Sequence, residues 1–386
     1  MSSMPKDGGI EDYALSLLSD LIAIPSVNPP GEKYDEICRR IESALKELGF
    51  RTRIVEGVKG KPNLIGTLGE GRPALLFNGH VDVVPPGMGW ETDPFKAVEK
   101  EGRIYGRGTS DMKGALAAMI AAVKKISDEG VALKGSLIFT ATVDEETGGL
   151  DGLGYLVRKE GLRADYCLSG EPTGLNVCRC EKGVYWSRIS VRGKAAHGST
   201  PERGINAIEK MAKIISALQS IRFEKEHKIL GRPTINIGVI SGGTKINIVP
   251  DYCEILVDRR MLPAEDPGEV KGEIESALKA VKAQDPLVDY RIEDLLFADP
   301  FELPEDAPLV KMAVSAVEEA LGRRPDITGL TGFTDARFTA VDAKIPSVLV
   351  GPGNIAQAHT ANEFVEKKQI LDAISVYATF LKRLLA

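Results

Sequence analysis

The chain has 386 residues, of which 43% are hydrophobic and 27% are charged. These values are typical of a globular protein, and the length exceeds what one ordinary hydrophobic core accommodates, so we expect two domains. The formal net charge of -6 gives no electrostatic support to nucleic-acid binding, although it leaves room for a local basic pocket that holds a small anionic substrate.

The sequence also argues against a membrane or secreted protein. No apolar run approaches the roughly 20 residues that a membrane helix needs, and residues 1–11 lack the charged-then-apolar pattern of a secretion signal. We therefore expect a cytoplasmic protein without a membrane partner. Five cysteines, an odd number scattered through a long chain, argue against a disulfide framework.

The first part of the chain alternates predicted helices and strands. Apolar residues at three- and four-residue steps predict a helix that starts near Tyr34 and ends near Leu48. An Ala-rich helix is expected over 113–126, and strands are expected over 63–68, 74–78 and 136–143. This mixed order predicts an α/β fold with helices on both faces of a sheet.

From about Gly183 the pattern changes to a β-α-β-β-α-β order. The expected strands are 186–191, 234–240, 252–258 and 288–292, and the expected helices are 205–218 and 268–281. A Pro-containing stretch, 299–304, follows, and then helices and a strand that resemble the first part. We therefore expect a catalytic domain at 1–181 and 296–386, interrupted by an inserted domain at 182–295.

Acidic and imidazole side chains follow several predicted strands. Ligands of open α/β sheets bind at the carboxyl ends of strands, so residues far apart in sequence converge there. His80-Val-Asp82 ends one strand, and Asp82 is placed to orient the His80 ring; the alternative is a polar surface turn. Asp111, on a tight Gly-rich loop before a helix, is placed to bridge two metal ions, and the alternative is helix capping by Ser110 or Asp111.

Three further motifs add ligands. Glu145 and Glu146 close the strand 136–143, where successive acids are costly unless cations neutralise them; the alternative is a solvated acidic turn. If Glu146 holds a metal, Glu145 is placed as a general base. Glu171 ends the next strand and offers another carboxylate, and His359 supplies an imidazole from beyond the insertion. This set of oxygen and nitrogen donors suits zinc.

Together the motifs resemble those of the co-catalytic zinc family that contains acetylornithine deacetylase, succinyl-diaminopimelate desuccinylase, aminoacylase and carboxypeptidase G. The resemblance spans nearly the whole chain. It rests on five motifs in the family's order, namely Gly-His80-Val-Asp82-Val-Val-Pro, Gly-Arg-Gly-Thr-Ser-Asp111-Met-Lys-Gly, Asp-Glu145-Glu146-Thr-Gly-Gly, Ser-Gly-Glu171-Pro-Thr and His359-Thr.

The resemblance implies a zinc-exopeptidase-like α/β/α catalytic domain and two Zn²⁺ per subunit, with Co²⁺ or Mn²⁺ as substitutes. By motif, Asp111 bridges the metals, His80 and Glu171 complete one site, and Glu146 and His359 complete the other. It further implies that Glu145 is the general base and that the peptide bond after Asp111 is cis.

The resemblance also implies that the inserted ferredoxin-like domain is a lid that forms a homodimer. Its His197 would reach the partner subunit's site and hydrogen-bond the substrate carbonyl, although an isolated histidine before a helix is better explained by a structural role. Asn247 and Arg260 match positions that hold a substrate carboxylate; the alternative for Arg260 is a surface salt bridge.

On the acyl side of the substrate, the resemblance places Thr334, Arg337 and Gly353. Many desuccinylases carry Gly-Gly-Thr-Ser-Asp where this chain has Thr331-Gly-Phe-Thr-Asp335, and this departure leaves the acyl group open. The expected activity is hydrolysis of the amide bond of a small N-acyl amino acid. A carboxypeptidase or dipeptidase with the same metals, and a non-catalytic metal- or ligand-binding module, are the alternatives.

Overall fold

The computed structural model describes residues 9–386, which form two compact units. The first unit contains the chain up to Arg179 together with Leu303–Thr328 and Thr334–Ala386. The second contains Cys180–Glu302 and Gly329–Phe333. The second unit is thus longer than the expected insertion at 182–295, because the strand expected to end at 292 continues to Ala298 and the segment 329–333 joins this unit.

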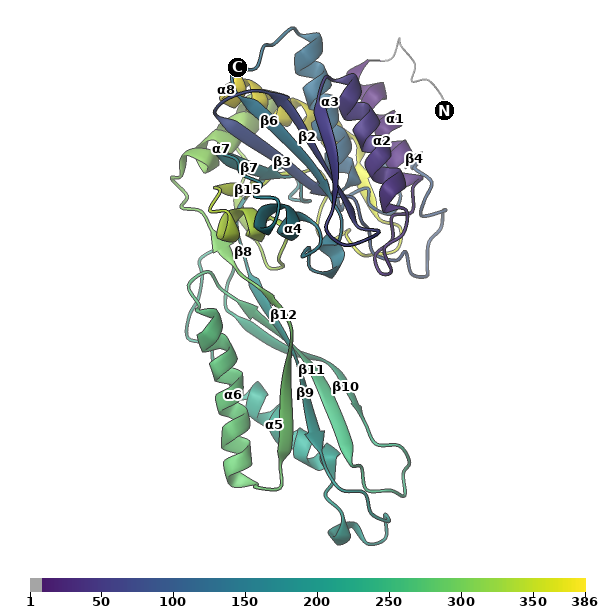
Figure 1. The fold of residues 1–386 in the computed structure, drawn as a ribbon, viewed down its shortest axis with the longest axis vertical. Helices are drawn as coiled ribbons and strands as arrows, with labels where there is room; N and C mark the ends of the chain where they lie inside the picture. The colour runs from purple at the N-terminus through teal and green to yellow at the C-terminus, as the bar shows by residue number, and fades with distance from the viewer. Residues whose placement is uncertain (1–8) are drawn as a thin grey trace. The chain divides into compact units, whose positions relative to one another are not determined.

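A mixed sheet forms the centre of the first unit (Figure 1). Its strands follow the order β1-β2-β6-β3-β7-β15-β8. Their bounds are β1 Arg51–Glu56, β2 Pro62–Gly69, β3 Ala74–His80, β6 Ser136–Thr142, β7 Tyr166–Ser169, β15 Ser347–Leu349 and β8 Val177–Glu181. β13 (Phe301–Glu302) and β14 (Ile327–Leu330) also pair with β8. A small separate sheet contains β4 (Val98–Lys100), β5 (Arg103–Tyr105) and β16 (Phe364–Glu366).

Four neighbouring strands, β6, β3, β7 and β15, are parallel. Their carboxyl ends therefore lie at the same edge of the sheet, and the loops that leave them meet there. Those loops begin after Thr142, His80, Ser169 and Leu349. The convergence that the sequence motifs predict follows directly from this strand order.

Helices cover both faces of the sheet, which confirms the expected α/β class. On β3, Leu75 and Phe77 face one core while Leu76 faces another, as the two-residue period of a strand requires. The larger core is covered by α1 (Ile10–Ile22), α2 (Tyr34–Glu47), α3 (Lys113–Asp128), α7 (Pro308–Leu321) and α8 (Lys367–Leu385). The smaller core is covered by α4 (Leu153–Arg158) and a π-helical segment at Phe338–Asp342. Helix α8, at the yellow end of the chain in Figure 1, packs beside α3 and α7.

The second unit is a four-stranded antiparallel sheet in the order β10-β11-β9-β12, with two helices on one face (Figure 1). The bounds are β9 Gly183–Arg192, α5 Ala207–Gln219, β10 Thr234–Gly242, β11 Tyr252–Met261, α6 Pro267–Gln284 and β12 Asp289–Ala298. Each expected element of the β-α-β-β-α-β unit is present. The helices begin where side-chain caps permit, because Asn206 and Asp266 accept the first free N–H groups of α5 and α6.

The structure also bears on the cysteines and on membrane helices. All five cysteines are buried free thiols. Within residues 9–386, no helix combines the length and the apolarity that a bilayer crossing requires.

Candidate metal centre

His80 is the last residue of β3 and its side chain is buried. Its Nδ1 lies 2.9 Å from the backbone carbonyl of Asp82 and 3.6 Å from the Asp82 carboxylate. The carbonyl can only accept, so Nδ1 carries the proton and Nε2 presents its lone pair. That lone pair lies 3.0 Å from an Asp111 carboxylate oxygen. Two acceptors at this distance need a cation or a proton between them. Burial lowers the pKa of His80, but the facing carboxylates of Asp111 and Asp82 raise it by more, so the net pKa of His80 is raised.

Asp82 has a second role that the sequence did not indicate. Its fully buried carboxylate accepts hydrogen bonds from the backbone N–H of Glu145 (3.3 Å) and of Glu146 (3.1 Å). The Asn28 amide also donates to it (2.8 Å). Asp82 thus fixes the turn that carries the two glutamates, and the backbone carbonyl of the same residue lies closer to the His80 ring than its carboxylate does.

Asp111 lies in the loop before α3, and its side chain points away from a capping role. The N-cap residue of α3 is Met112, α3 has no side-chain cap, and Ser110 Oγ donates to the carbonyl of Phe364, so the capping alternative is wrong. The Asp111–Met112 peptide is cis, as the family resemblance implied. One Asp111 oxygen lies 3.0 Å from His80 Nε2 and the other 3.6 Å from His359 Nε2.

Glu145 and Glu146 occupy a short 3-10 helix after β6 (Glu145–Thr147), and both residues are half-buried. The Glu146 side chain is 4% exposed and lies 3.0 Å from His359 Nε2, so the alternative of a solvated acidic turn is wrong. Burial raises the pKa of Glu145 well above its ordinary value; His80 opposes this, and Glu171 and Glu146 add to it. The hydrogen bond that the Glu146 carboxylate accepts from the ring raises the pKa of His359.

Two groups of three ligand residues result, each with donor atoms within 4.8 Å of one another. The first contains His80, Asp111 and Glu171, and the second contains Asp111, Glu146 and His359. Asp111 belongs to both. Buried carboxylates this close repel one another unless cations neutralise them, and imidazole nitrogen with carboxylate oxygen is a donor set that zinc, cobalt and manganese accept. The residues present therefore fit two divalent metal ions.

The three residues expected on the acyl side lie in the first unit. Thr334 and Arg337 are buried, and Arg337 donates to the carbonyl of Gly148 (2.5 Å), in the turn that follows Glu146. Gly353 is a close-approach position, because a side chain there would lie 2.6 Å from Ser110 Oγ. Gly353 and Arg337 thus contact the turns that carry Asp111 and Glu146.

His197 and Asn247 lie in neighbouring segments of the second unit. His197 bridges to Ile248, and the Gly198 N–H donates to the carbonyl of Asn247 (2.8 Å). The Ser199 N–H donates to His197 Nδ1 (3.1 Å), so in the neutral ring Nε2 carries the proton. The exposed imidazole therefore presents a hydrogen-bond donor, which is the role that the family resemblance assigns to it.

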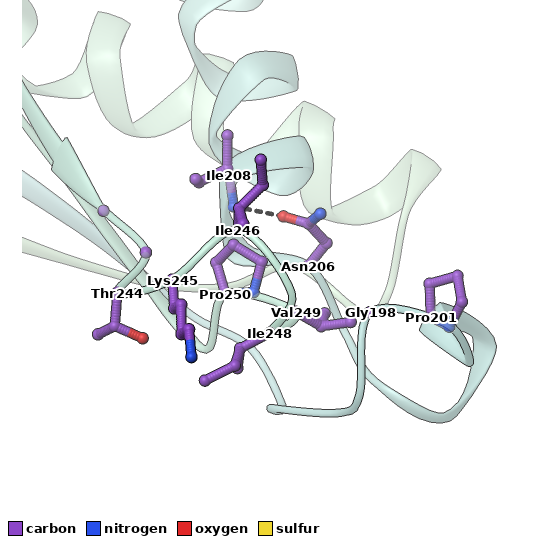
Figure 2. A pocket seen from close by; sticks show the side chains of 12 residues that line it. Gly198, Pro201, Asn206, Ile208, Thr244, Lys245, Ile246, Ile248, Val249 and Pro250 are labelled. Atoms are coloured by element: carbon purple, nitrogen blue, oxygen red, sulfur yellow. Dashed lines mark hydrogen bonds between the residues drawn. The ribbon is translucent and has the colours of Figure 1, made fainter.

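These two segments border a pocket of 570 Å³ (Figure 2). Its lining combines apolar side chains and glycines with the polar residues Asn206, Thr244 and Lys245. Asn206, at the N-cap of α5, accepts a hydrogen bond from the Ile208 N–H. Arg260 lies elsewhere in this unit, at the end of β11, where it forms an ion pair with Asp258 (2.8 Å). This ion pair agrees with the salt-bridge alternative for Arg260 and does not decide between the two roles.

Three residues that hold the site together are not among the site residues predicted from the sequence. Glu363 and Arg107 form a buried ion pair beside Asp111 (2.7 Å), and Asn28 supports Asp82. Glu363 lies only four residues after His359, but a glutamate in a polar segment gives no sign that it is buried. Asp335 lies at the back of the site, where burial raises its pKa to about 7 and Thr142 donates to it.

Comparison with known proteins agrees with this geometry. Residues 76–383 match the family model described as peptidase family M20/M25/M40, so the chain belongs to this family of metal-dependent hydrolases. Acetylornithine deacetylase from Proteus mirabilis is 35% identical over 366 residues, which cover 91% of this chain and 92% of that protein. The family resemblance inferred from the motifs is confirmed.

Solved structures show the same fold. An aminopeptidase PepT from Bacillus cereus superposes with a TM-score of 0.80 at 25% identity, covering 97% of this chain and 99% of that one. An M20 family metallo-carboxypeptidase, Sso-CP2 from Sulfolobus solfataricus, gives 0.83 at 23% identity, covering 96% and 98%.

Proposed function

We propose that this enzyme hydrolyses the amide bond of a small N-acyl amino acid and that it uses two divalent metal ions, zinc in the first place, with cobalt or manganese as substitutes. The observation that supports the metal proposal most strongly is the pair of ligand groups that share Asp111. The similarity to acetylornithine deacetylase supports the substrate class.

In this proposal His80, Asp111 and Glu171 hold one metal, and Asp111, Glu146 and His359 hold the other. When bound, such ions polarise a carbonyl group and make water a stronger acid. The protein supplies the geometry for them. Asp82 contributes by orienting the His80 ring through its carbonyl and by fixing the Glu145–Glu146 turn through its carboxylate.

Glu145 moves the proton. Its carboxylate takes a proton from water as the water oxygen attacks the scissile carbonyl carbon. It then gives that proton to the amide nitrogen as the C–N bond breaks, so that a carboxylic acid and a free amine leave. The place of Glu145 in the turn that also carries the proposed ligand Glu146 supports this role, because a general base must lie within reach of the water that it deprotonates.

The substrate contacts follow the family resemblance. In this proposal His197 donates from Nε2 to the substrate carbonyl of the partner subunit, and Asn247 and Arg260 bind the free carboxylate of the amino acid. Thr334, Arg337 and Gly353 lie on the acyl side.

The second unit supports the proposed homodimer. β10 is an edge strand of its sheet, and two apolar side chains on it are exposed, Val239 (50%) and Ile240 (57%). In the loop that follows, Ile246, which is labelled in Figure 2, is fully exposed to solvent according to its accessible surface. An apolar edge strand favours pairing with another chain, and we propose that a second copy of this chain covers it. Sedimentation equilibrium would show a dimer, and Ile240→Lys should shift it toward monomer.

The experiment that tests the activity uses two isosteric variants. Glu145→Gln should lower kcat by at least about 100- to 10,000-fold, the usual contribution of a general base, and keep two metals per chain. Glu146→Gln should lose one metal. Glu70→Gln, on the surface, serves as the control. Retained turnover in Glu145→Gln would refute the assignment of the base.

The same preparation decides the substrate. The rates of hydrolysis of N-acetyl and N-succinyl amino acids are compared with those of dipeptides, because the proteins of similar structure include an aminopeptidase and a carboxypeptidase. Faster hydrolysis of dipeptides would favour the peptidase alternative. No hydrolysis of any of these by a fully metallated sample would favour a metal-binding module.

A further inference from the structure

Glu363 lies between His359 and β16, and its side chain is 1% exposed. Both oxygens of its carboxylate are engaged. One accepts from the backbone N–H of Ser110 (2.8 Å) and of Asp111 (3.2 Å). The other accepts from Arg107 Nη1 (2.7 Å) and from the N–H of Gly108 (3.1 Å). With four donors directed at it, this carboxylate is a fixed acceptor for the loop that ends at Asp111 and is not a metal ligand.

Arg107 extends the connection to a third loop. Its other terminal nitrogen donates to the carbonyl of Pro86 (3.2 Å), four residues after Asp82, and its guanidinium lies 5.2 Å from the Trp90 ring centroid. The loops after β3, before α3 and before β16 are thereby tied together at one buried ion pair. Each of these loops follows or carries one of the proposed ligands, namely His80, Asp111 and His359.

We propose that Glu363 is a positioning residue that holds Asp111 and His359 in place before a metal ion binds. This inference rests on the proposed metal centre. Its physical basis is that a buried carboxylate with four charge-assisted or backbone hydrogen bonds fixes the groups that donate to it. The Asp111 backbone N–H is one of those donors, and His359 belongs to the same short segment as Glu363.

The two metal sites should depend on Glu363 to different degrees. The site with Glu146 takes two of its three residues, Asp111 and His359, from segments that Glu363 fixes. The site with His80 and Glu171 takes only Asp111 from them, because the other two residues follow β3 and β7. Loss of the Glu363 carboxylate should therefore weaken the site with Glu146 selectively. A purely structural role would lower stability without changing the ratio of the two affinities.

The test is Co²⁺ titration of metal-free protein, followed by absorption spectroscopy and by the metal content after gel filtration. Glu363→Gln keeps the size of the side chain but replaces one acceptor oxygen by an NH₂ group that faces N–H donors. The Co²⁺ affinity of the site with Glu146 should fall about 10- to 100-fold, as is usual when a residue that orients a metal ligand is lost, while that of the site with His80 and Glu171 changes less. Glu366→Gln is the matched control, because Glu366 lies three residues later, at the end of β16, in an exposed pair with Arg103 and should change neither affinity.

Two further measurements keep the inference open to refutation if Glu363→Gln does not fold. Glu363→Asp retains the charge but is shorter by one methylene, so it should show the same selective loss to a smaller degree. In the wild-type protein, the amides of Gly108, Ser110 and Asp111 should be protected from hydrogen exchange before metal is added.

The outcomes separate this inference from the proposed function. Wild-type protein that binds no Co²⁺ would refute the metal centre itself. If wild-type protein binds two Co²⁺ and the folded variants bind them with unchanged affinities, the positioning role of Glu363 is refuted and the metal centre stands. Amides that become protected only after Co²⁺ is added would refute it in the same way.

Discussion

The substitution Asp82→Asn tests how the glutamate turn is held, and its effect can be worked out from three hydrogen bonds. If the new amide oxygen keeps the bonds from Asn28 and the Glu146 N–H, its NH₂ group faces the Glu145 N–H, which loses its acceptor. One buried donor left without a partner costs about 1–3 kcal/mol. The metal-free variant should be less stable by that amount, and its metal affinity should fall about 10- to 100-fold.

The assay is urea unfolding of the metal-free protein in a Trp186→Phe background. The chain has two tryptophans, so the remaining fluorescence comes from Trp90, in the first unit. Asp20→Asn is the control, because Asp20 forms an exposed ion pair with Arg40, which contributes at most about 1 kcal/mol. An Asp82→Asn variant with the unfolding midpoint and metal affinity of the wild type would show that the Asp82 carboxylate does not hold the turn.

Three other outcomes can be checked. Gly149→Ala should destabilise the first unit well beyond the roughly 1–2 kcal/mol that a left-handed conformation costs, because its Cβ would lie 1.9 Å from an Asp335 oxygen. Gly102→Ala is the control: Gly102 also has a positive φ but open space around it, so this change should cost only the left-handed conformation. Equal unfolding midpoints of the two variants would contradict the prediction. Burial raises the pKa of the Cys38 and Cys167 thiols to about 12, so at pH 8 iodoacetamide should leave both unmodified in the native protein and modify all five cysteines in urea, as mass spectrometry would show. Removal of metal by a chelator should lower the melting temperature, since a ligand at 100 times its Kd stabilises the folded state by about 2.7 kcal/mol; an unchanged melting temperature would argue against tight metal binding.

Much of the fold was predictable because periodicity and strand-end motifs are local signals. The Ala-rich helix expected over 113–126 is α3, and the expected strand at 136–143 is β6. Helix α1 and strand β1 were not predicted, although α1 supplies Leu17 and Leu21 to the larger core. The segment 329–333 was placed in the other part of the chain, because its packing partners are distant in sequence.

In the candidate site, too, residues in local motifs were predictable and residues that depend on distant partners were not. His80, Asp111, Glu146, Glu171 and His359 were found because each is a typical ligand in a recognisable motif, and the structure brings all five together. Glu363 was not found, because its role depends on four donors from residues 107–111, some 250 positions away. A charged residue that is buried by long-range partners has the same sequence signature as one on the surface.

The interruption of the first unit has a consequence for synthesis on the ribosome. The second unit draws its core from residues 185–288, a continuous stretch that can pack as soon as it has emerged. The larger core of the first unit needs α8, whose buried residues extend to Leu385. A nascent chain therefore lacks part of the cover of this core, including Tyr377 beside Phe77 of β3, until α8 has emerged, and a premature stop before α8 would leave that surface exposed to chaperones and proteases.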